Sequence, residues 1–459
     1  MQGSKRIGEP SQIHSSVAGI VWPGLPASTG TKLLALQFQL ERTQWLPPER
    51  LRELQFRQLD ALLRHAYGTA PYYRERWRGL YDPGEPLTPE RFFRLPLLKR
   101  ADLQANFHSL RCATVPATHG SVTESRTSGS TGTPVRVLKT EFVELMWQAV
   151  LLREHLWFRR DLSGKLASIR QGVTEGEADG WGPATDTVTR TGRSATLSIR
   201  ADVDTQLRWL ERQQADYLMT YPSNLVELIR SSLARGIRLA TLREVRTFGE
   251  ILPPETRESC RRAWGVPVTD AYSSQEVGYI ALQCPLHEHY HVQSECVLVE
   301  ILDDQGRACT PGETGRVVVT SLHNFALPLV RYEIGDYADA GLPCDCGRGL
   351  PVLGRVAGRV RNILVLENGA RYWPAFGSAS LSNIAPILQQ QLVQKSFNTI
   401  EARLVTARPL TSEEEERLRR HVQARLPVPF EIRFSYSGAI GRSAGGKYED
   451  FVSEVAAPP

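Results

Sequence analysis

Residues 127–134 read Thr-Ser-Gly-Ser-Thr-Gly-Thr-Pro, and a valine-containing segment, residues 135–138, follows them. The two glycines allow the backbone to bend sharply and to present its N–H groups inward. A concave row of such donors binds anions, and hydroxyl side chains add further donors to phosphate oxygens. The P-loop pattern is absent, because no Gly-Lys-Ser/Thr follows at the required spacing. The stretch predicts a phosphate-binding loop, against the alternative of an ordinary flexible turn, and the residues of this loop are Thr127, Ser128, Gly129, Ser130, Thr131 and Gly132.

The composition of the chain excludes several classes of protein. Its 459 residues are 41% apolar and 23% charged, which is typical of a soluble globular protein. The net charge of +5 is small for this length and no run of like charges occurs, so we expect no nucleic-acid binding. No apolar run approaches the roughly 20 residues of a membrane span, and no apolar segment of a secretory signal follows the N-terminus. Seven cysteines, an odd number, favour reduced thiols in the cytoplasm over a disulfide framework.

Helical and strand patterns alternate along the chain, which is typical of an α/β protein. Apolar residues recur at helical spacing from Leu33 to about Trp77, where Pro47-Pro48 marks a helix start and Ala70-Pro71 a break. Further helices are predicted over residues 141–157, 204–214, 224–235 and 412–426, the last opened by Ser412 and Glu415 at capping-box spacing. Strands are predicted over residues 246–248, 297–301, 316–319 and 363–366.

These patterns divide the chain into three units. Residues 1–30 are rich in Ser, Gly and Pro and are predicted to form a flexible arm. Residues 31–360 are predicted to form a large N-terminal domain of β-sheets layered with helices. Residues 361–459 are predicted to form a smaller α+β domain.

Three later stretches carry further reactive side chains. They are DAYSSQEVG at 270–278, RYEIGD at 331–336 continued by Gly358-Arg359, and GGKY at 445–448. Each is a weak signal alone, but their order and spacing resemble those of the adenylate-forming superfamily of acyl-CoA synthetases and peptide-synthetase adenylation domains. Residues 70–74, 95–103 and 221–225 extend the resemblance to the phenylacetate–CoA ligase branch, and it covers the chain from about residue 35 to the end.

The resemblance implies an enzyme that activates a carboxylic acid with ATP to an acyl-adenylate and pyrophosphate. Charge builds on phosphate oxygens in this reaction, so donors and cations must gather around them. Glu276 matches the family glutamate that binds Mg²⁺, a hard cation that takes carboxylate, water and phosphate oxygens. Asp336 matches the residue that accepts hydrogen bonds from both ribose hydroxyls, and Arg359 is expected near ribose or phosphate. The residues expected around the adenine are Gly249, Glu250, Ala271, Tyr272 and Ser273.

The resemblance also implies a catalytic lysine on a mobile lid. Lys447 matches the family lysine that bridges the carboxylate and the α-phosphate, a task that suits a point charge on a flexible stem. It belongs to the C-terminal domain, which is expected to rotate between adenylation and acyl transfer and then to present residues 368–370. Two departures from the family pattern occur: Thr133 replaces the usual loop lysine, and residues 360–362 lack the usual hinge aspartate.

The sequence specifies the acid substrate and the acceptor of the acyl group less closely than it specifies the nucleotide site. Tyr221, Phe248 and Trp373, expected near the pocket, are compatible with an aromatic acid and are equally often plain core residues. The acceptor is expected to be the thiol of CoA, and a carrier protein or an amine is the alternative. A second alternative is a degenerate nucleotide-binding module without catalysis. Whether the chain forms a homodimer is left open.

A separate group of cysteines and histidines predicts a structural zinc site. Residues 284–291 read Cys-Pro-Leu-His-Glu-His-Tyr-His, and Cys-Asp-Cys follows at 344–346. Thiolates and imidazoles are the ligands that zinc takes in closed tetrahedral sites, although the Cys-x-Cys spacing is shorter than the usual one. The predicted ligands are Cys284, either His287 or His291, Cys344 and Cys346. The alternative is a set of reduced cysteines and surface histidines.

Overall fold

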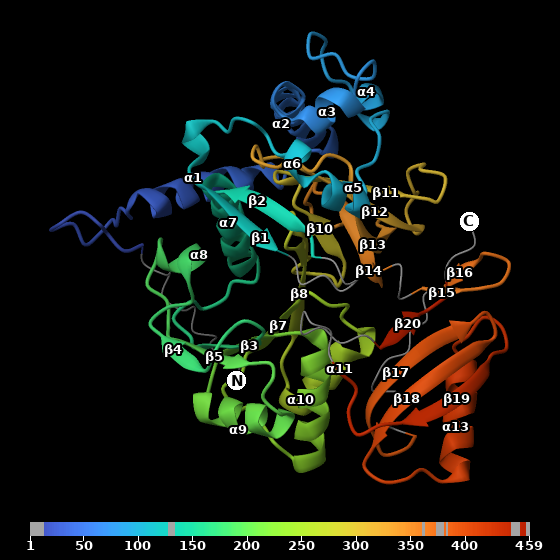
Figure 1. Ribbon diagram of the computed structural model, residues 1–459. Coiled ribbons are helices and arrows are strands. Elements are labelled where there is room, and N and C mark those ends of the chain that lie inside the picture. The colour runs from blue at the N-terminus through green and yellow to red at the C-terminus, as the bar shows by residue number, and fades with distance from the viewer. Residues whose placement is uncertain are drawn as a thin grey trace.

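The computed structural model describes residues 13–126, 134–359, 363–372, 381, 384–441 and 450–455. Among these residues, a mixed twelve-stranded sheet with helices makes up the large part of the molecule, and a mixed four-stranded sheet makes up a small C-terminal unit (Figure 1). This arrangement confirms the predicted α/β class. The helices are α1 (Ser28–Thr43), α2 (Pro48–Thr69), α3 (Pro71–Arg76), α4 (Pro89–Phe93), α5 (Arg100–Ala105), α6 (Phe107–Leu110), η1 (Ala117–His119), α7 (Glu141–Trp157), α8 (Pro183–Asp186), α9 (Val203–Gln213), α10 (Pro222–Arg235), α11 (Pro254–Trp264) and α13 (Ser412–Gln423).

The strands of the large part are β1 (Val122–Arg126), β2 (Arg136–Thr140), β3 (Leu166–Arg170), β4 (Gly176–Ala178), β5 (Ser194–Ser198), β6 (Tyr217–Thr220), β7 (Glu244–Phe248), β8 (Val268–Ser274), β9 (Gly278–Gln283), β10 (Tyr290–Val292), β11 (Val297–Leu302), β12 (Thr314–Ser321), β13 (Tyr332–Ala340) and β14 (Val352–Arg359). They are followed by β15 (Leu364–Val365), β16 (Arg371–Tyr372), β17 (Ile387–Ser396), β18 (Thr399–Thr406), β19 (Glu431–Tyr436) and β20 (Phe451–Ser453).

The large sheet combines a parallel half with an antiparallel half. Its order is β11-β12-β13-β14-β10-β9-β8-β7-β6-β3-β5-β4. In the first half, β5, β3, β6, β7 and β8 each run parallel to the next strand in this series. In the second half, β8, β9, β10, β14, β13, β12 and β11 each pair antiparallel with the next strand. A parallel pair needs a crossover connection, and α9, α10 and α11 supply the crossovers between β5, β6, β7 and β8. The carboxyl ends of β7 and β8 therefore meet at one edge of the sheet.

Most predicted helices and strands begin and end close to the predicted residues. α7 spans Glu141–Trp157 as predicted, and the Val143 N–H donates to Oγ1 of Thr140 at its start, at 3.3 Å. α2 begins at Pro48. Proline has no backbone N–H, and at the first position of a helix that N–H would have no partner within the helix. The helices α9 and α10 and the strands β7, β11, β12 and β15 also overlap their predicted ranges. None of the helices in the described ranges has the length and apolar character needed to cross a membrane.

α13 begins at Ser412 as predicted, but its capping residue differs from the predicted one. Thr411, and not Ser412, caps the helix: the Glu414 N–H donates to Thr411 Oγ1 at 3.2 Å, and the Thr411 N–H donates to the Glu414 carboxylate at 2.9 Å. Both pairs satisfy the capping-box spacing, and the ion pair of Arg408 with Glu414 at 2.7 Å favours the observed one. The helix also ends at Gln423, before the predicted Leu426.

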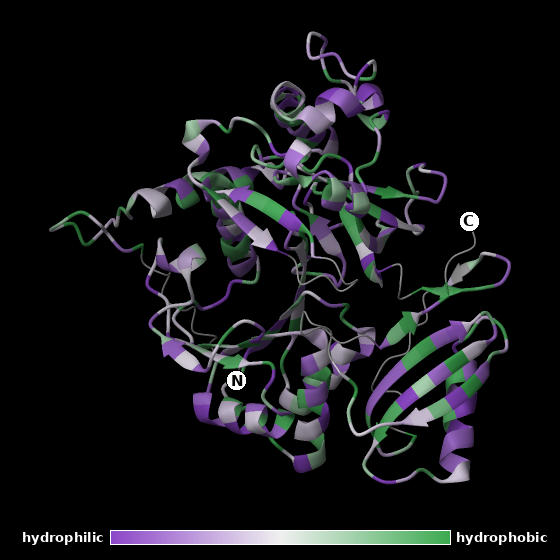
Figure 2. Ribbon diagram, in the orientation of Figure 1, coloured by the Kyte–Doolittle hydropathy of each residue, from purple (hydrophilic) through white to green (hydrophobic). Residues whose placement is uncertain are grey.

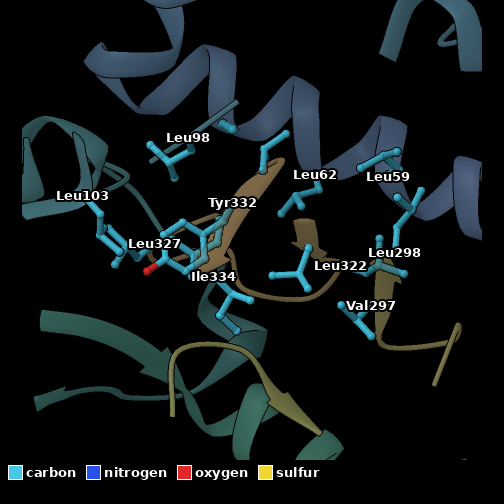
Figure 3. Close-up of a cluster of buried hydrophobic side chains, with 14 of the residues drawn as sticks. Leu59, Leu62, Leu98, Leu103, Val297, Leu298, Leu322, Leu327, Tyr332 and Ile334 are labelled. Carbon is cyan, nitrogen blue, oxygen red and sulfur yellow. The ribbon is translucent and has the colours of Figure 1, made fainter. Parts of the chain in front are cut away.

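Separate apolar cores stabilise the large part and the small unit. The largest described core lies where α2 packs on the strands β11 to β13. The small unit has its own core, in which Leu418 and Val422 of α13 pack with Leu392 and Leu404 of β17 and β18. The rest of α13 is mostly hydrophilic (Figure 2). Figure 3 shows part of the first core, with Leu59, Leu62, Leu98, Leu103, Val297, Leu298, Leu322, Leu327, Tyr332 and Ile334 labelled.

The small unit contacts the large part beside α10 and α11 (Figure 1). Arg230 of α10 donates from Nη1 to the carbonyl oxygens of Ile387, at 2.9 Å, and of Leu388. The predicted domain boundary at residue 360 stays a prediction, because residues 360–362 lie outside the described ranges. Within the predicted N-terminal arm, Ile13 forms an isolated antiparallel bridge with Thr189.

Candidate functional site

Asp336 lies on β13 beside two hydrogen-bond donors from other strands. It pairs in register with Arg359 of β14, and the Arg359 Nε lies 3.4 Å from Asp336 Oδ1. The Tyr272 hydroxyl of β8 donates to Asp336 Oδ2 at 2.8 Å. Burial, and then the Asp336 carboxylate, raise the pKa of Tyr272, so this hydroxyl keeps its proton. Tyr272 from one predicted stretch therefore meets Asp336 and Arg359 from another.

Glu276 lies in the turn between β8 and β9, and its side chain is only 8% exposed. Its Oε1 lies 3.4 Å from Nη1 of Arg100, the first residue of α5. Arg100 was not predicted as a site residue, because locally it is one more cation at the start of a short helix. Only the fold brings it to a carboxylate 176 residues away in sequence. A buried carboxylate whose contact with Arg100 is as long as 3.4 Å can bind Mg²⁺, which takes its other ligands from water and phosphate oxygens.

A cavity of about 450 Å³, including its open mouth, lies between α7 and the β8–β9 turn. One face of α7 forms the first wall, through residues at helical spacing. Gly278 forms part of the second wall with a φ of +105°, and a Cβ there would lie 3.3 Å from the ring of Trp147. Glycine therefore allows the strand to approach the indole. The α7 residues of the wall are Val143, Met146, Trp147 and Val150, and the others include Glu276, Tyr279, Cys296, Ser321, His323 and Asn324.

The residues predicted around the adenine lie together at the carboxyl ends of β7 and β8. Ala271 pairs in register with Phe248, the last residue of β7, and Gly249 continues the chain with a φ of +77°. Glu250 accepts a hydrogen bond from the Ser223 N–H at 3.0 Å, which ties the turn to the start of α10. Ligands of open α/β sheets bind outside the carboxyl ends of parallel strands, and this turn occupies such a position.

Tyr221 and Phe248, predicted to contact the acid, do not line the cavity. Their rings are tilted against each other with centroids 4.9 Å apart, and they pack in the apolar core formed by α9 to α11 and the parallel strands. Tyr221 is 8% exposed, and the Gln171 N–H donates to its hydroxyl at 3.4 Å. A contact of this pair with the acid stays a prediction. Trp373 lies outside the described ranges.

The predicted phosphate loop joins two paired strands. Residues 127–133 lie outside the described ranges, and β1 and β2 flank them, with Arg126 paired in register with Arg136. Both guanidinium groups contact Glu124, at 3.4 Å from Arg126 and at 2.7 Å from Arg136. Two arginines against one carboxylate leave net positive charge at the base of the loop, where the chain has Thr133 in place of the family lysine.

Lys447 also lies outside the described ranges, and Asp450 is the first described residue after it. Burial, and then the carboxylates of Glu250, Glu255 and Glu227, raise the pKa of Asp450 to about 7. Asp450 therefore lies close to Glu250, which belongs to the predicted adenine-flanking turn.

The cysteine and histidine cluster contains one residue that the sequence did not single out. Ligand atoms of Cys284, His289, His291 and Cys344 all lie within 4.8 Å of one another. Cys346, which was predicted, lies with its Sγ 3.3 Å from His291 Nε2. His289 was missed because, by sequence, three alternating histidines are equivalent. His287 pairs instead with Asp345, at 2.6 Å.

The electronic state of these histidines fits a metal ligand. Burial lowers the pKa of His291 to about 4, so its imidazole is neutral at pH 7. Nε2 of His289 and Nδ1 of His291 are buried, and neither has a hydrogen-bond partner among the described residues. Buried polar atoms rarely lack a partner, and two soft thiols stand beside them, with Cys284 Sγ 3.9 Å from Cys344 Sγ. This donor set matches that of structural zinc sites.

A buried network of charges supports the cavity wall from behind. Glu154 of α7 is 1% exposed and pairs with Arg246 of β7 at 2.6 Å and with Arg160 at 3.2 Å. Arg160 also pairs with Glu244 at 2.6 Å. Arg246 donates to the hydroxyl of Tyr279, a residue of the cavity wall, at 2.6 Å. The network links α7, β7 and β9, so it holds two walls of the cavity against each other.

The chain is similar to known ligases over most of its length. No family model matches it. The phenylacetate-coenzyme A ligase of Thermus thermophilus is 24% identical over 443 residues, which are 88% of this chain and 96% of that protein. A solved structure of 2-hydroxyisobutyryl-CoA ligase in the postadenylation state has a TM-score of 0.72 at 17% identity and covers 90% of this chain and 92% of its own.

The same 2-hydroxyisobutyryl-CoA ligase in the thioesterification state, with bound CoA, has a TM-score of 0.59 at 18% identity, covering 90% of this chain and 91% of its own.

Proposed function

We propose that this chain, a member of the adenylate-forming superfamily with distant homologues named phenylacetate-coenzyme A ligase over most of its length, is an AMP-forming acid–thiol ligase. It activates a carboxylic acid, aromatic in our proposal, with ATP, and then passes the acyl group to CoA. The observation that carries the proposal is the hydrogen bond that the Tyr272 hydroxyl donates to Asp336. After burial and Asp336, the charge of Glu276 also raises the pKa of Tyr272, and Glu276 lines the cavity beside α7. An acceptor for the ribose diol and a carboxylate that can bind magnesium therefore lie close together.

The first step joins the acid to the α-phosphate of ATP. A carboxylate oxygen attacks the α-phosphorus, the bond to the β-phosphate breaks, and pyrophosphate leaves. Asp336 accepts hydrogen bonds from the ribose hydroxyls, because an ionised carboxylate has only acceptors, and Tyr272 and Arg359 keep that carboxylate in place. Glu276 would hold Mg²⁺ together with phosphate oxygens, and the ion would neutralise the charge that develops there.

The second step transfers the acyl group. The CoA sulfur loses its proton and attacks the acyl carbon, and AMP leaves with the electron pair of the broken C–O bond. Lys447 is proposed to act in the first step only. The small unit is proposed to turn between the steps and to present residues 368–370, where Gly369 has a φ of +80°.

Acid-dependent exchange of labelled pyrophosphate into ATP is expected in the presence of Mg²⁺. We expect Asp336→Asn to raise the KM for ATP by about tenfold or more, because a charged hydrogen bond to the ribose is lost. Asp339→Asn is the matched control: it lies on the same strand and pairs with Arg355 and Thr314, away from Tyr272. The control should leave the KM for ATP unchanged.

The outcomes separate the alternatives. ATP binding without exchange for any acid in a broad panel would favour a degenerate nucleotide-binding module. With an active acid, CoA should release AMP over many turnovers. Accumulation of the adenylate in the presence of CoA, relieved by a carrier protein or an amine, would favour the alternative acceptor.

We also propose that Cys284, His289, His291 and Cys344 hold a structural zinc ion, with Cys346 as a competing ligand. Purified protein should contain about one zinc per chain by elemental analysis, and Cys344→Ser should reduce this content to well below one. Cys309→Ser is the control, since Cys309 lies outside the cluster. A low zinc content that Cys344→Ser does not change would dismiss the site.

A further inference from the structure

Arg331 is a buried arginine that joins the end of α4 to β11. It is the first residue of the stretch RYEIGD and is 6% exposed. Its guanidinium pairs with the Glu300 carboxylate through two bonds, from Nη2 at 2.7 Å and from Nε at 3.1 Å. Its Nη1 donates to the carbonyl oxygens of Phe93 and Leu95, each at 2.5 Å. A two-bond contact of this kind fixes direction as well as distance, so the segment after α4 has a defined place on the sheet.

The backbone of Arg331 is left-handed, with a φ of +50°. Residues other than glycine, asparagine and aspartate rarely adopt this conformation, because their Cβ lies too close to a carbonyl oxygen. Two hydrogen bonds hold it: the Arg331 N–H donates to Thr320 Oγ1 of β12, and the Leu98 N–H donates to the Arg331 carbonyl oxygen, each at 2.9 Å. Unfavourable backbone conformations persist only where the surroundings determine them, and they gather at functional sites. The conformation of Arg331 therefore calls for an explanation.

The segment that Arg331 holds leads directly into α5. Leu98 forms an isolated parallel bridge with Tyr332, the residue after Arg331, and the two side chains belong to the same apolar core (Figure 3). Leu98 is 2% exposed, and α5 begins two residues later, at Arg100. The place of Arg100 therefore follows from the bonds that Arg331 makes to this segment.

Arg100 and Tyr332 both lie near the Glu276 carboxylate. Arg100 Nη1 lies 3.4 Å from Glu276 Oε1. Burial raises the pKa of Tyr332 most, the charge of Glu276 raises it further, and the charge of Arg100 lowers it. The hydroxyl of Tyr332 is therefore close to both charged groups. Arg331 thus precedes one of these residues in the chain and holds the segment before the other.

We propose that Arg331 is a positioning residue for the adenylation step, an inference that rests on the proposed function. Together with Glu300 it fixes the segment before α5, and this segment sets the distance of the Arg100 guanidinium from Glu276. Arg331 acts through Arg100, because its own guanidinium faces Glu300 and the carbonyl oxygens of residues 93 and 95. Charged groups stabilise a transition state best when they are held in place before the reaction. A shift of about 1 Å in such a group can reduce the rate about 10²-fold.

The test measures kcat/KM for ATP in acid-dependent pyrophosphate exchange, with thermal unfolding to check that each variant is folded. Glu300→Gln keeps the shape of the partner and removes its charge, and it should reduce kcat/KM about 10- to 100-fold. Thr320→Val keeps a similar shape and removes one hydrogen bond to the left-handed residue, so it should reduce kcat/KM about three- to tenfold. Glu333→Gln is the matched control: its side chain pairs with Arg316 at 3.0 Å between β12 and β13, and it should leave kcat/KM unchanged.

A double-mutant cycle separates positioning from a structural role. Arg100→Gln removes the group through which Arg331 is proposed to act, and it should itself reduce kcat/KM about tenfold or more. In that background Glu300→Gln should cost less than about threefold, because the effects of residues that act through one another are not additive. A pair with a structural role only would lower the unfolding temperature and leave the kcat/KM of the folded enzyme unchanged.

Two results would overturn the inference. The first is an unchanged kcat/KM in folded Thr320→Val and Glu300→Gln. The second is a loss from Glu300→Gln that has the same size in the wild type and in Arg100→Gln, since the pair would then act independently of Arg100. If Glu300→Gln does not fold, Thr320→Val replaces it in both measurements. In each of these cases the wild type still exchanges pyrophosphate, and the proposed function stands. Exchange that is absent from the wild type with every acid overturns the proposed function together with the inference.

Discussion

Lys447→Ala is expected to slow acyl-adenylate formation by about 10²–10³-fold, equivalent to roughly 3–4 kcal/mol of transition-state stabilisation, while the affinity for ATP changes little. The lysine would neutralise charge that develops on the α-phosphate only as pyrophosphate leaves, so its loss affects the rate more than binding. Three peptide units join Lys447 to Asp450 and span at most roughly 11 Å. Asp450 lies close to Glu250, so the lysine can reach the predicted nucleotide site.

The two half-reactions distinguish a catalytic lysine from a structural one. Thioester formation from a pre-made acyl-adenylate should barely change in Lys447→Ala, because the small unit then presents residues 368–370. Lys395→Ala is the matched control on the same unit, since Lys395 pairs with Glu454 on the surface. Rates are measured by pyrophosphate exchange for the first step and by AMP release for the second. An equal loss in both steps would make Lys447 structural, and the two-faced lid would have to be abandoned.

Glu154→Gln is expected to lower the free energy of unfolding at pH 7 by about 3–5 kcal/mol, because it leaves buried arginines without their counter-charge. Burial alone would raise the pKa of Glu154, but Arg246 and Arg160 outweigh it and lower the pKa to about 2. A carboxylate whose pKa is lower in the folded chain than its unfolded value of about 4.3 stabilises the fold above that value. This contribution is lost as the pH falls through the folded pKa.

The pH dependence has a definite sign. The difference in unfolding free energy between wild type and Glu154→Gln, measured in urea, should be constant from pH 7 to about 5 and should shrink between about pH 4 and pH 2. Glu53→Gln is the control, because Glu53 is exposed and pairs with Arg50 on the surface of α2. Arg246 also donates to the hydroxyl of Tyr279, so Glu154→Gln removes the counter-charge of the arginine that holds this ring. A difference that does not vary with pH would contradict the assigned role of Glu154.

Features that depend on neighbouring residues were predictable from the sequence. α7 was predicted with its observed ends because its apolar spacing is local, and its capping residue Thr140, which the prediction did not use, is local too. The same locality explains the error at α13, where Thr411 with Glu414 and Ser412 with Glu415 have the same spacing, and Arg408 decides between them. Asp336, Glu276 and Tyr272 were predicted through the order of motifs in a family, and the fold brings two of them, Asp336 and Tyr272, into contact.

What covers each face was decided only by the tertiary structure. The apolar face of α7 was visible in the sequence, but helical spacing cannot tell a packed face from one that lines a cavity with Trp147. Arg100 meets Glu276 from 176 residues away, and Glu154 meets Arg246 from 92 residues away. No local preference distinguishes such charged residues from solvated ones. Their positions follow from the strand order of the large sheet. A buried charge is stable only beside an opposite charge, and here that charge comes from a residue far away in the sequence.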